Sequence, residues 1–319
     1  MHCICRGEDI DATHKTAFRK WFSYIGELRS ICPSATFLAL SATCTLKIRQ
    51  RVLKILNMKS TDIREITLSP NRQNIKLTIS KVSNEVEIAM TWLIDALNDL
   101  KENFPKTIIY CNSITDASKI YTCIIDELPE CSDVVNMFHS ESTAKCKAMI
   151  IRELKDMNSK MRIVIATNAL GMGIDIINCY SIVLYGAPHN VLDLVQEIGR
   201  AGRDGKDSVA MVLYNSFNLR TVEPDVKAVV TSTNCRRLAM LNAFLRESDL
   251  QQVPNKTHTC CDICANKCGC GNCTFLPLET LFRSNKLEIM KKVILMPQRR
   301  MICQTLRVET DMLDHSSAL

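Results

Sequence analysis

The chain has 319 residues, a formal net charge of +6 and 17 cysteines. Its hydrophobic content of 46% is sufficient for packed cores and excludes an intrinsically disordered chain. The mild positive charge is compatible with a nucleic-acid ligand but does not indicate one by itself. No apolar run is long enough to cross a bilayer, and Arg6, Glu8 and Asp9 interrupt any signal-peptide core. We therefore expect an intracellular protein whose cysteines do not form a disulfide framework.

The first predicted element in chain order is a buried strand at Phe37–Thr43, which ends in small hydroxyl residues. A helix follows that begins after Asn84 and stops before Pro105. Beyond it, strand and helix patterns alternate. Strands are predicted at 107–111, 134–138, 162–166, 181–185 and 209–214, and helices at 115–127, 142–157 and 191–199. This α/β alternation predicts a doubly wound parallel sheet, covered by helices on both faces, with function at the carboxyl ends of its strands.

Two segments near those strand ends carry the strongest functional signal. Ala166–Asp175 turns through Gly171 and Gly173, and Gln196–Gly205 reads QEIGRAGRDG. Arg200 and Arg203 are three residues apart, a spacing that places them on one face of a helix, where two guanidinium groups suit a polyphosphate. Either segment alone is compatible with a solvated arginine face and ordinary turn glycines. Their order and spacing together favour a functional pair.

The two segments resemble motifs V and VI of the superfamily 2 helicases, and the second is most similar to the RecQ family. The resemblance implies a RecA-like sheet, one complete and one partial, with ATP and Mg²⁺ bound between two such domains. It also implies that Arg203 is the arginine finger, with Arg200 and Gln196 in support. The nucleotide-side residues would be Asp175, Gly173 and Gly199, and the residues that contact single-stranded or forked DNA would be Thr167, Asn112 and Ser113.

Other segments support the same family. Phe37–Thr43 resembles motif III, Ile109–Ser113 resembles motif IV, and residues 69–82 are similar to the linker between the two RecA-like domains. His139 follows Phe138 where the family has an aromatic–histidine pair, although a satisfied histidine at a strand end is equally expected. The resemblance implies a 3′-to-5′ DNA helicase that acts in DNA repair or recombination in the nucleus.

The sequence lacks the phosphate-binding loop Gly-x-x-x-x-Gly-Lys-Ser/Thr that a helicase needs. Gly205-Lys206 is followed by Asp207, and Asp126-Glu127 lies at a predicted helix end, so neither replaces a missing motif. His2-Cys3-Ile4 resembles the tail of motif II. We therefore expect the carboxyl-terminal part of a helicase, inactive by itself. A non-catalytic DNA-binding remnant and a shortened sequence of a full helicase remain as alternatives.

Seven cysteines crowd between Cys235 and Cys273, as in a metal site. Cys235 resembles the first ligand of the RecQ zinc domain, and His258, Cys261 and Cys264 have the i, i+3, i+6 spacing of the other three. The hypothesis is one structural Zn²⁺ with a Cys₃His shell, for which Cys260 is a competing fourth ligand. Cys268, Cys270 and Cys273 are interpreted as free thiols rather than a second metal site, and the cations Arg236 and Arg237 as a solvated face.

The expected organisation has five parts. They are a partial first RecA-like domain at 1–68, a linker at 69–82, a second RecA-like domain at 83–217, a zinc-binding domain at 218–278 and a basic tail at 279–319.

Overall fold

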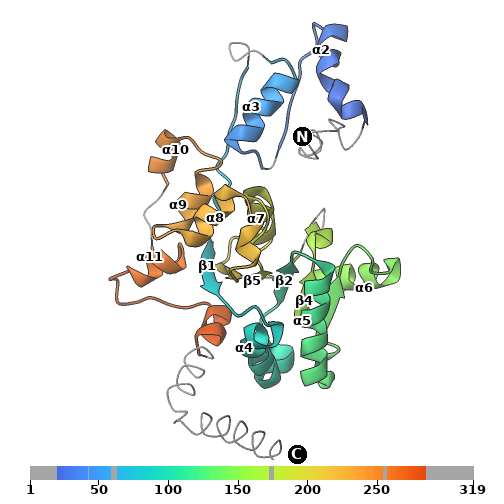
Figure 1. Ribbon diagram of the computed structural model, residues 1–319, viewed down its shortest axis with the longest axis vertical. Helices are drawn as coiled ribbons and strands as arrows, with labels where there is room; N and C mark the ends of the chain where they lie inside the picture. Colours follow the sequence, from blue (N-terminus) through green and yellow to red (C-terminus); the bar gives the residue numbers. More distant parts are fainter. Residues whose placement is uncertain (1–19, 42, 59–62, 172–175, 254–256, 285–319) are drawn as a thin grey trace, which may run out of the picture.

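The computed structural model describes residues 20–41, 43–58, 63–171, 176–253 and 257–284 (Figure 1). Within them, six strands form one parallel sheet in the order β1-β6-β5-β2-β4-β3. The strands are β1 (Ile75–Lys81), β2 (Thr107–Cys111), β3 (Val135–Phe138), β4 (Ile163–Ala166), β5 (Ser181–Tyr185) and β6 (Ser208–Tyr214). The predicted parallel α/β fold is confirmed.

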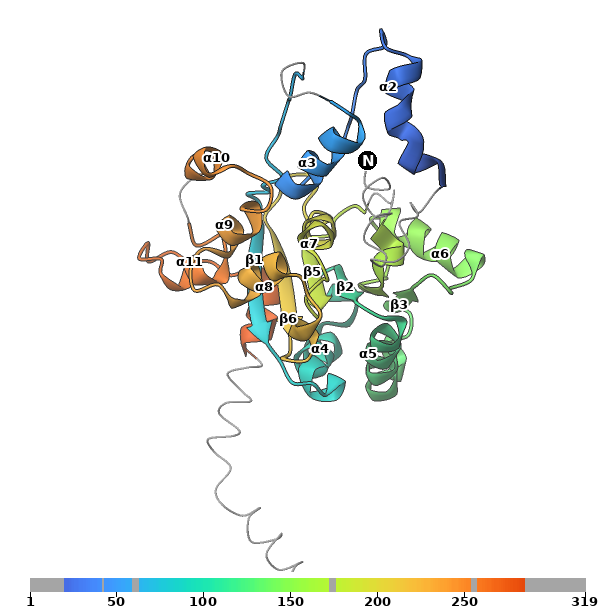
Figure 2. The same cartoon turned by 45° about the horizontal axis from the view of Figure 1, so that its top comes forward.

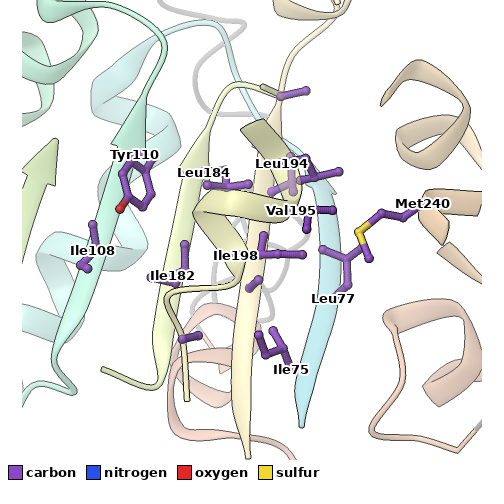
Figure 3. Close-up of a cluster of buried hydrophobic side chains, with 14 of the residues drawn as sticks. Ile75, Leu77, Ile108, Tyr110, Ile182, Leu184, Leu194, Val195, Ile198 and Met240 are labelled. Carbon is purple, nitrogen blue, oxygen red and sulfur yellow. The ribbon is translucent and has the colours of Figure 1, made fainter. Parts of the chain in front are cut away.

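Helices cover both faces of the sheet, because alternate strand residues point to opposite sides. In β2, Ile108 and Tyr110 join one hydrophobic cluster, while Ile109 and Cys111 join the other. The first cluster is shared with α6 (Ala144–Lys155), α7 (Val191–Ile198) and α8 (Pro224–Thr231), and the second with α4 (Val86–Leu100) and α5 (Ile114–Glu127). Figure 3 shows α7 packed over β1, β5 and β6 through Leu194, Val195 and Ile198.

The sequence located these elements closely. The strands predicted at 107–111 and 181–185 have the bounds of β2 and β5, and the other three predicted strands differ from β3, β4 and β6 by one residue at their starts. Short 3-10 helices complete the connections at η3 (Lys101–Asn103), η4 (Pro129–Cys131), η5 (Asn168–Gly171) and η6 (Asn218–Arg220).

The strand predicted at Phe37–Thr43 is wrong for the described residues of that segment. Residues 35–41 belong to neither helix nor strand, and Leu38 and Leu40 are 81% and 74% exposed. An apolar strand is stable only when neighbouring strands pair with it and other layers cover it. The described part of the chain offers this segment no strand partner. Around it lie η1 (Lys20–Glu27), α2 (Leu28–Ile31) and α3 (Leu46–Ile55).

The structure also corrects the linker predicted at 69–82. Its second half is β1, an edge strand whose residues Ile75 to Lys81 pair in register with Ser208 to Tyr214 of β6. The residues of β1 alternate apolar and polar as IKLTISK, and Ile75 and Leu77 are almost fully buried. Only residues 69–74 therefore remain as a connection before the sheet.

After the sheet, α9 (Arg236–Leu241), α10 (Glu247–Gln251) and α11 (Asp262–Asn266) lie on the β1 side of the molecule in both views (Figures 1 and 2). A final described helix covers residues 277–284, which the sequence assigned in part to a basic tail. It is anchored to the sheet by the fully buried Leu278 and by a buried ion pair in which Lys76 Nζ lies 2.9 Å from Glu279 Oε1. The rest of that tail lies outside the described residues.

Candidate nucleotide-facing site and metal centre

The arginine-rich segment begins on α7 and ends in a tight turn. The side chain of Asn190 caps α7 by accepting a hydrogen bond from the Asp193 N–H. The helix ends at Ile198, so Arg200 and Arg203 lie beyond it rather than on one helical face. This corrects the sequence argument, because the two guanidinium groups have different surroundings. Arg200 is only 6% exposed, whereas Arg203 is exposed.

Two glycines shape this turn. A Cβ on Gly199 would lie 2.8 Å from the Val195 carbonyl oxygen. Gly202 has a φ of +50°, in the left-handed region, and a Cβ there would lie 2.5 Å from the Lys206 carbonyl oxygen. The turn therefore requires glycine at both positions for steric reasons, whatever contact Gly199 makes to a nucleotide.

The carbonyl groups of this turn are held by the connection that precedes the sheet. The Arg72 guanidinium donates hydrogen bonds to the carbonyl oxygens of Gly199 at 3.3 Å, Ala201 at 3.2 Å and Gly202 at 2.6 Å. The Asn74 amide donates to Gly202 at 2.9 Å and to the Lys206 carbonyl oxygen at 2.8 Å. Sequence reasoning missed both residues, because a linker resemblance gives no signal for a side chain that reaches 130 positions along the chain.

Gln196 is exposed and contacts the other end of the described chain. Its Nε2 donates a hydrogen bond to Thr43 Oγ1 at 3.1 Å. Thr43 closes the segment that resembles motif III, so the structure brings the motif III and motif VI segments into direct contact. Gly173 and Asp175 lie outside the described residues.

Asn112, Ser113 and Thr167 lie at one edge of the sheet. Asn112 and Ser113 directly follow β2, Thr167 directly follows β4, and Tyr110 pairs with Ala166 between those strands. Asn112 donates from Nδ2 to the Ala187 carbonyl oxygen at 3.0 Å. The Ser113 hydroxyl caps α5 by accepting a hydrogen bond from the Asp116 N–H. Thr167 is half-buried, and its N–H donates to the Phe138 carbonyl oxygen at 3.2 Å.

Glu197 is a buried carboxyl beside this site that the sequence analysis did not single out. It is 8% exposed and lies one residue from Gln196. Burial raises the pKa of Glu197 to about 8, the nearby Asp193 adds to the rise, and Arg200 opposes it. The motif VI segment therefore contains a carboxyl that is largely protonated at neutral pH.

Four cysteines form a buried group at the β1 edge of the sheet. The Sγ atoms of Cys235, Cys260, Cys261 and Cys264 all lie within 4.8 Å of one another, and all four residues are buried. Cys235 precedes α9, and Cys261 precedes α11. In a tetrahedral zinc–thiolate site, sulfur atoms 2.3 Å from the metal are about 3.8 Å apart. The Cys235–Cys260 Sγ separation of 3.6 Å fits that shell.

The polar contacts of the group favour a thiolate at Cys261. Hydrogen bonds with Cys235 and Cys261 raise the pKa of Cys260, and burial raises that of Cys264. Hydrogen bonds from Cys235 and Cys260 lower the pKa of Cys261, and the Cys264 N–H donates to Cys261 Sγ at 3.5 Å. The Arg237 Nε donates to Cys260 Sγ at 3.4 Å. Positive charge and donors directed at sulfur stabilise the deprotonated ligands that Zn²⁺ takes. The residues present therefore fit a structural zinc ion.

The structure separates His258 from the three cysteines with which the sequence grouped it. Its imidazole lies instead with Cys268, Cys270 and Cys273. Cys260 completes the buried group, because its Sγ is directed at Cys235. Between the two fourth ligands that the sequence left open, the geometry favours Cys260. Residue spacing alone could not reveal this, since Cys260 and Cys261 are adjacent and only the direction of each side chain distinguishes them.

Arg236 and Arg237 are buried rather than solvated, at 9% and 6% exposed. Arg236 pairs with Asp262, with Nε 2.7 Å from Oδ1, and donates to the Val230 carbonyl oxygen at 2.8 Å. Arg237 donates to Asn71 Oδ1 at 2.9 Å, to the Arg72 carbonyl oxygen at 2.8 Å and to the carbonyl oxygen of Ile75. These arginines link the cysteine group to α8 and to residues 69–74. That connection in turn holds the turn at residues 199–205, here called the arginine turn.

Comparison with known proteins shows similarity to helicases. Residues 89–205 match the helicase conserved C-terminal domain. The chain is 29% identical over 293 residues to the bifunctional 3'-5' exonuclease/ATP-dependent helicase WRN of Mus musculus, a match that covers 82% of the chain and 19% of that relative. It is 28% identical over 287 residues to the ATP-dependent DNA helicase RecQ of Pasteurella multocida, covering 82% of the chain and 42% of that relative.

A third relative is R290 of Acanthamoeba polyphaga mimivirus, which carries the name of an ATP-dependent RNA helicase. It is 30% identical over 288 residues, or 84% of the chain and 47% of R290. The chain thus spans less than half the length of each of these relatives. These matches support a carboxyl-terminal part of a superfamily 2 helicase, with a RecA-like sheet. Within that superfamily the chain is RecQ-like, as its motifs indicate. Among the described residues, no helix has both the length and the apolar character needed to cross a membrane.

We predict that Cys260→Ser, and not His258→Ala, opens the buried group. In zinc-loaded protein, an alkylating reagent should reach Cys235, Cys261 and Cys264 much faster in Cys260→Ser than in the unchanged chain, because the metal loses a ligand. Mass spectrometry of the peptides reads each cysteine separately. Protection lost in His258→Ala but kept in Cys260→Ser would restore His258 as the fourth ligand.

We predict that Glu197→Gln stabilises the fold increasingly as the pH rises. Between pH 4.5 and about 8 the folded chain keeps a proton on Glu197 that the unfolded chain releases, so the fold loses stability across that window. Glutamine removes this loss, with a gain on the order of a few kcal/mol above pH 8. Urea unfolding at pH 5, 7 and 9 measures it. The exposed Glu141, changed to glutamine, is the control, and a Glu197→Gln gain that does not vary with pH would contradict the prediction.

Proposed function

We propose that this chain is the catalytic carboxyl-terminal part of a 3′-to-5′ DNA helicase of the RecQ type, acting in DNA repair or recombination in the nucleus. ATP with Mg²⁺ would bind between its RecA-like sheet and a first RecA-like domain. The observation that carries the proposal is the arginine turn. Exposed Arg203 lies in a turn fixed by Arg72 and Asn74, and Gln196 on the adjoining helix contacts Thr43 of the motif III segment.

Arg203 is assigned as the arginine finger, and Arg200 as a positioning residue. A finger must reach a γ-phosphate held by another domain, which an exposed guanidinium on a surface turn can do and a buried one cannot. Arg72 holds the carbonyl groups of Gly199, Ala201 and Gly202, and so fixes the backbone directly before Arg203. A donor fixed before the reaction stabilises developing charge without reorganisation. Gly173, Gly199 and Asp175 are proposed for the nucleotide side.

DNA is proposed to lie along the edge formed by the ends of β2 and β4. Asn112, Ser113 and Thr167 share that edge, and Ser113 begins the 14-residue helix α5. Polar side chains and a helix N-terminus are the groups that commonly contact phosphate oxygens. RecQ of Pasteurella multocida is named as a DNA helicase, which supports DNA as the ligand. The name of R290 makes RNA the comparison to include in any binding test.

The exposed apolar side chains before the sheet support the proposal that a further part of the first domain exists. Leu38, Leu40, Ile66 and Leu68 are between 74% and 86% exposed and occur two by two at alternate positions, as in strands. We propose that the remainder of a RecA-like sheet, with its phosphate-binding loop, covers them. The alternative is a DNA-binding remnant without catalysis.

We predict that the 319-residue chain alone does not hydrolyse ATP, with or without DNA. An arginine finger accelerates phosphoryl transfer only when the β- and γ-phosphates are already held. Steady-state phosphate release with single-stranded DNA measures this. Release above buffer that disappears in Arg203→Ala would contradict it and would mean that these residues contain another nucleotide site.

We predict that joining a first RecA-like domain from a RecQ relative restores activity that depends on Arg203. Arg203→Ala should then lower kcat by about 10³-fold or more with a much smaller change in ATP affinity, because the finger acts on the transition state. Exposed Arg152, changed to alanine, is the matched control and should leave both values unchanged. Equal losses in kcat and affinity would make Arg203 a ground-state ligand, and inactivity of the joined protein would favour the remnant.

A further inference from the structure

A second group of metal-ligating side chains lies outside the buried cysteines. It consists of His258, Cys268, Cys270 and Cys273, whose ligand atoms all lie within 4.8 Å of one another. The two groups share no residue. The buried group already has four sulfur atoms, so it does not require His258 as a ligand. His258 and the three later cysteines are therefore available as a second set of four ligands.

The distances fit a tetrahedral shell with one nitrogen and three sulfur ligands. His258 Nδ1 lies 3.3 Å from Cys270 Sγ and 3.8 Å from Cys268 Sγ, and the Cys270 and Cys273 Sγ atoms are 3.4 Å apart. Zinc bonds of about 2.3 Å to sulfur and about 2.0 Å to nitrogen place the ligand atoms roughly 3.5–3.8 Å from one another. The same imidazole nitrogen faces two of the sulfurs, so one ring orientation serves the whole shell.

Burial does not explain why these side chains converge. None of residues 265–277 is buried, and residues 268–276 form neither helix nor strand. Gly271 has a φ of +71°, and a Cβ on Gly269 or Gly271 would meet no atom within 4 Å. A loop without a core has little reason to gather three thiols and an imidazole at one point unless something binds them there.

We propose that His258, Cys268, Cys270 and Cys273 bind a second Zn²⁺ ion, independent of the buried four-cysteine site. Three thiolates and one imidazole form a common structural zinc shell, and this donor set suits Zn²⁺ rather than Mg²⁺ or Ca²⁺. Four protein ligands leave no open position, so the ion is structural. It fixes the loop between α11 and the helix at 277–284. The inference does not depend on helicase activity.

A Cys270–Cys273 redox pair is the main rival occupant of this loop. The 3.4 Å separation of these sulfurs exceeds the bond length of about 2.05 Å in a disulfide, but two cysteines with two residues between them can form a disulfide on oxidation. This reading uses only two of the four side chains. It gives no role to His258 Nδ1 or to Cys268 Sγ, which face the same point.

Zinc stoichiometry tests the proposal. The full 319-residue chain, purified without chelator and in the presence of Zn²⁺, should contain two zinc ions per chain by elemental mass spectrometry. Cys270→Ser/Cys273→Ser and His258→Ala should each contain one. The double variant Cys32→Ser/Cys146→Ser removes the same number of thiols outside both groups and should keep two. In Cys270→Ser/Cys273→Ser, Cys235 and Cys264 should stay protected from alkylation, which shows that the buried ion remains.

Three results would overturn the inference. The first is a single zinc in the unchanged chain that Cys270→Ser/Cys273→Ser retains. The second is loss of both ions in that variant while circular dichroism shows the sheet folded, since the sites would then not be independent. The third is a Cys270–Cys273 disulfide found by peptide mapping of zinc-loaded protein. Cys270 and Cys273 lie outside the hydrophobic core, so the sheet should stay folded in this variant while its zinc content is measured.

Discussion

The hydrogen bonds of the Arg237 guanidinium are the interaction that links the cysteine group, the sheet and the arginine turn. This guanidinium is buried, and it donates to Asn71, to the Arg72 and Ile75 carbonyl oxygens, and to Cys260. A guanidinium held away from water is stable only when nearly all its donors are used, and hydrogen bonds to a charged group contribute about 1.5–3 kcal/mol each. Arg72 is held in this way and in turn holds the turn that carries Arg203. The position of the proposed catalytic arginine is therefore coupled, through two guanidinium groups, to the cysteine group beside β1.

Much of the fold could be predicted from the sequence, because the strands from β2 to β6 are short apolar runs between amphipathic helices. Such runs have few alternatives once they are buried on both faces. The failures have a shared cause. Phe37–Thr43 has the composition of a strand, yet composition does not supply a partner, and Leu38 stays exposed. Ile75–Lys81 follows a proline-containing segment that resembles a linker, yet β6 provides the partner that makes it a strand.

The candidate site was less predictable for a related reason. Motif spacing located Gln196, Arg200 and Arg203, but it could not show that α7 ends at Ile198 and leaves one arginine buried and the other exposed. Likewise, the i, i+3, i+6 spacing selected His258 as a ligand of the buried group. The direction of each side chain, which spacing does not give, places Cys260 there instead. Arg72, Asn74 and Arg237 gave no sequence signal, since each acts on carbonyl groups far along the chain. Every residue has a backbone carbonyl group, so the sequence does not show which of them will accept a hydrogen bond from a distant side chain.

The two groups of metal-ligating residues constrain different parts of the chain. The segment after the sheet consists of short helices and loops, which bury little apolar surface of their own and gain most from cross-links. The buried cysteines lie against β1, where the Leu77 N–H donates to the Cys260 carbonyl oxygen at 3.2 Å and Met240 packs toward Leu77 (Figure 3). Constraint at that group extends through Arg237 to the arginine turn. The second group joins His258, which precedes α11, to the loop that carries Cys268, Cys270 and Cys273. The helix that follows this loop is already fixed by Leu278 and by the pair of Lys76 with Glu279. The buried group therefore constrains the arginine turn, while the second group constrains the path of the chain between α11 and the helix at 277–284.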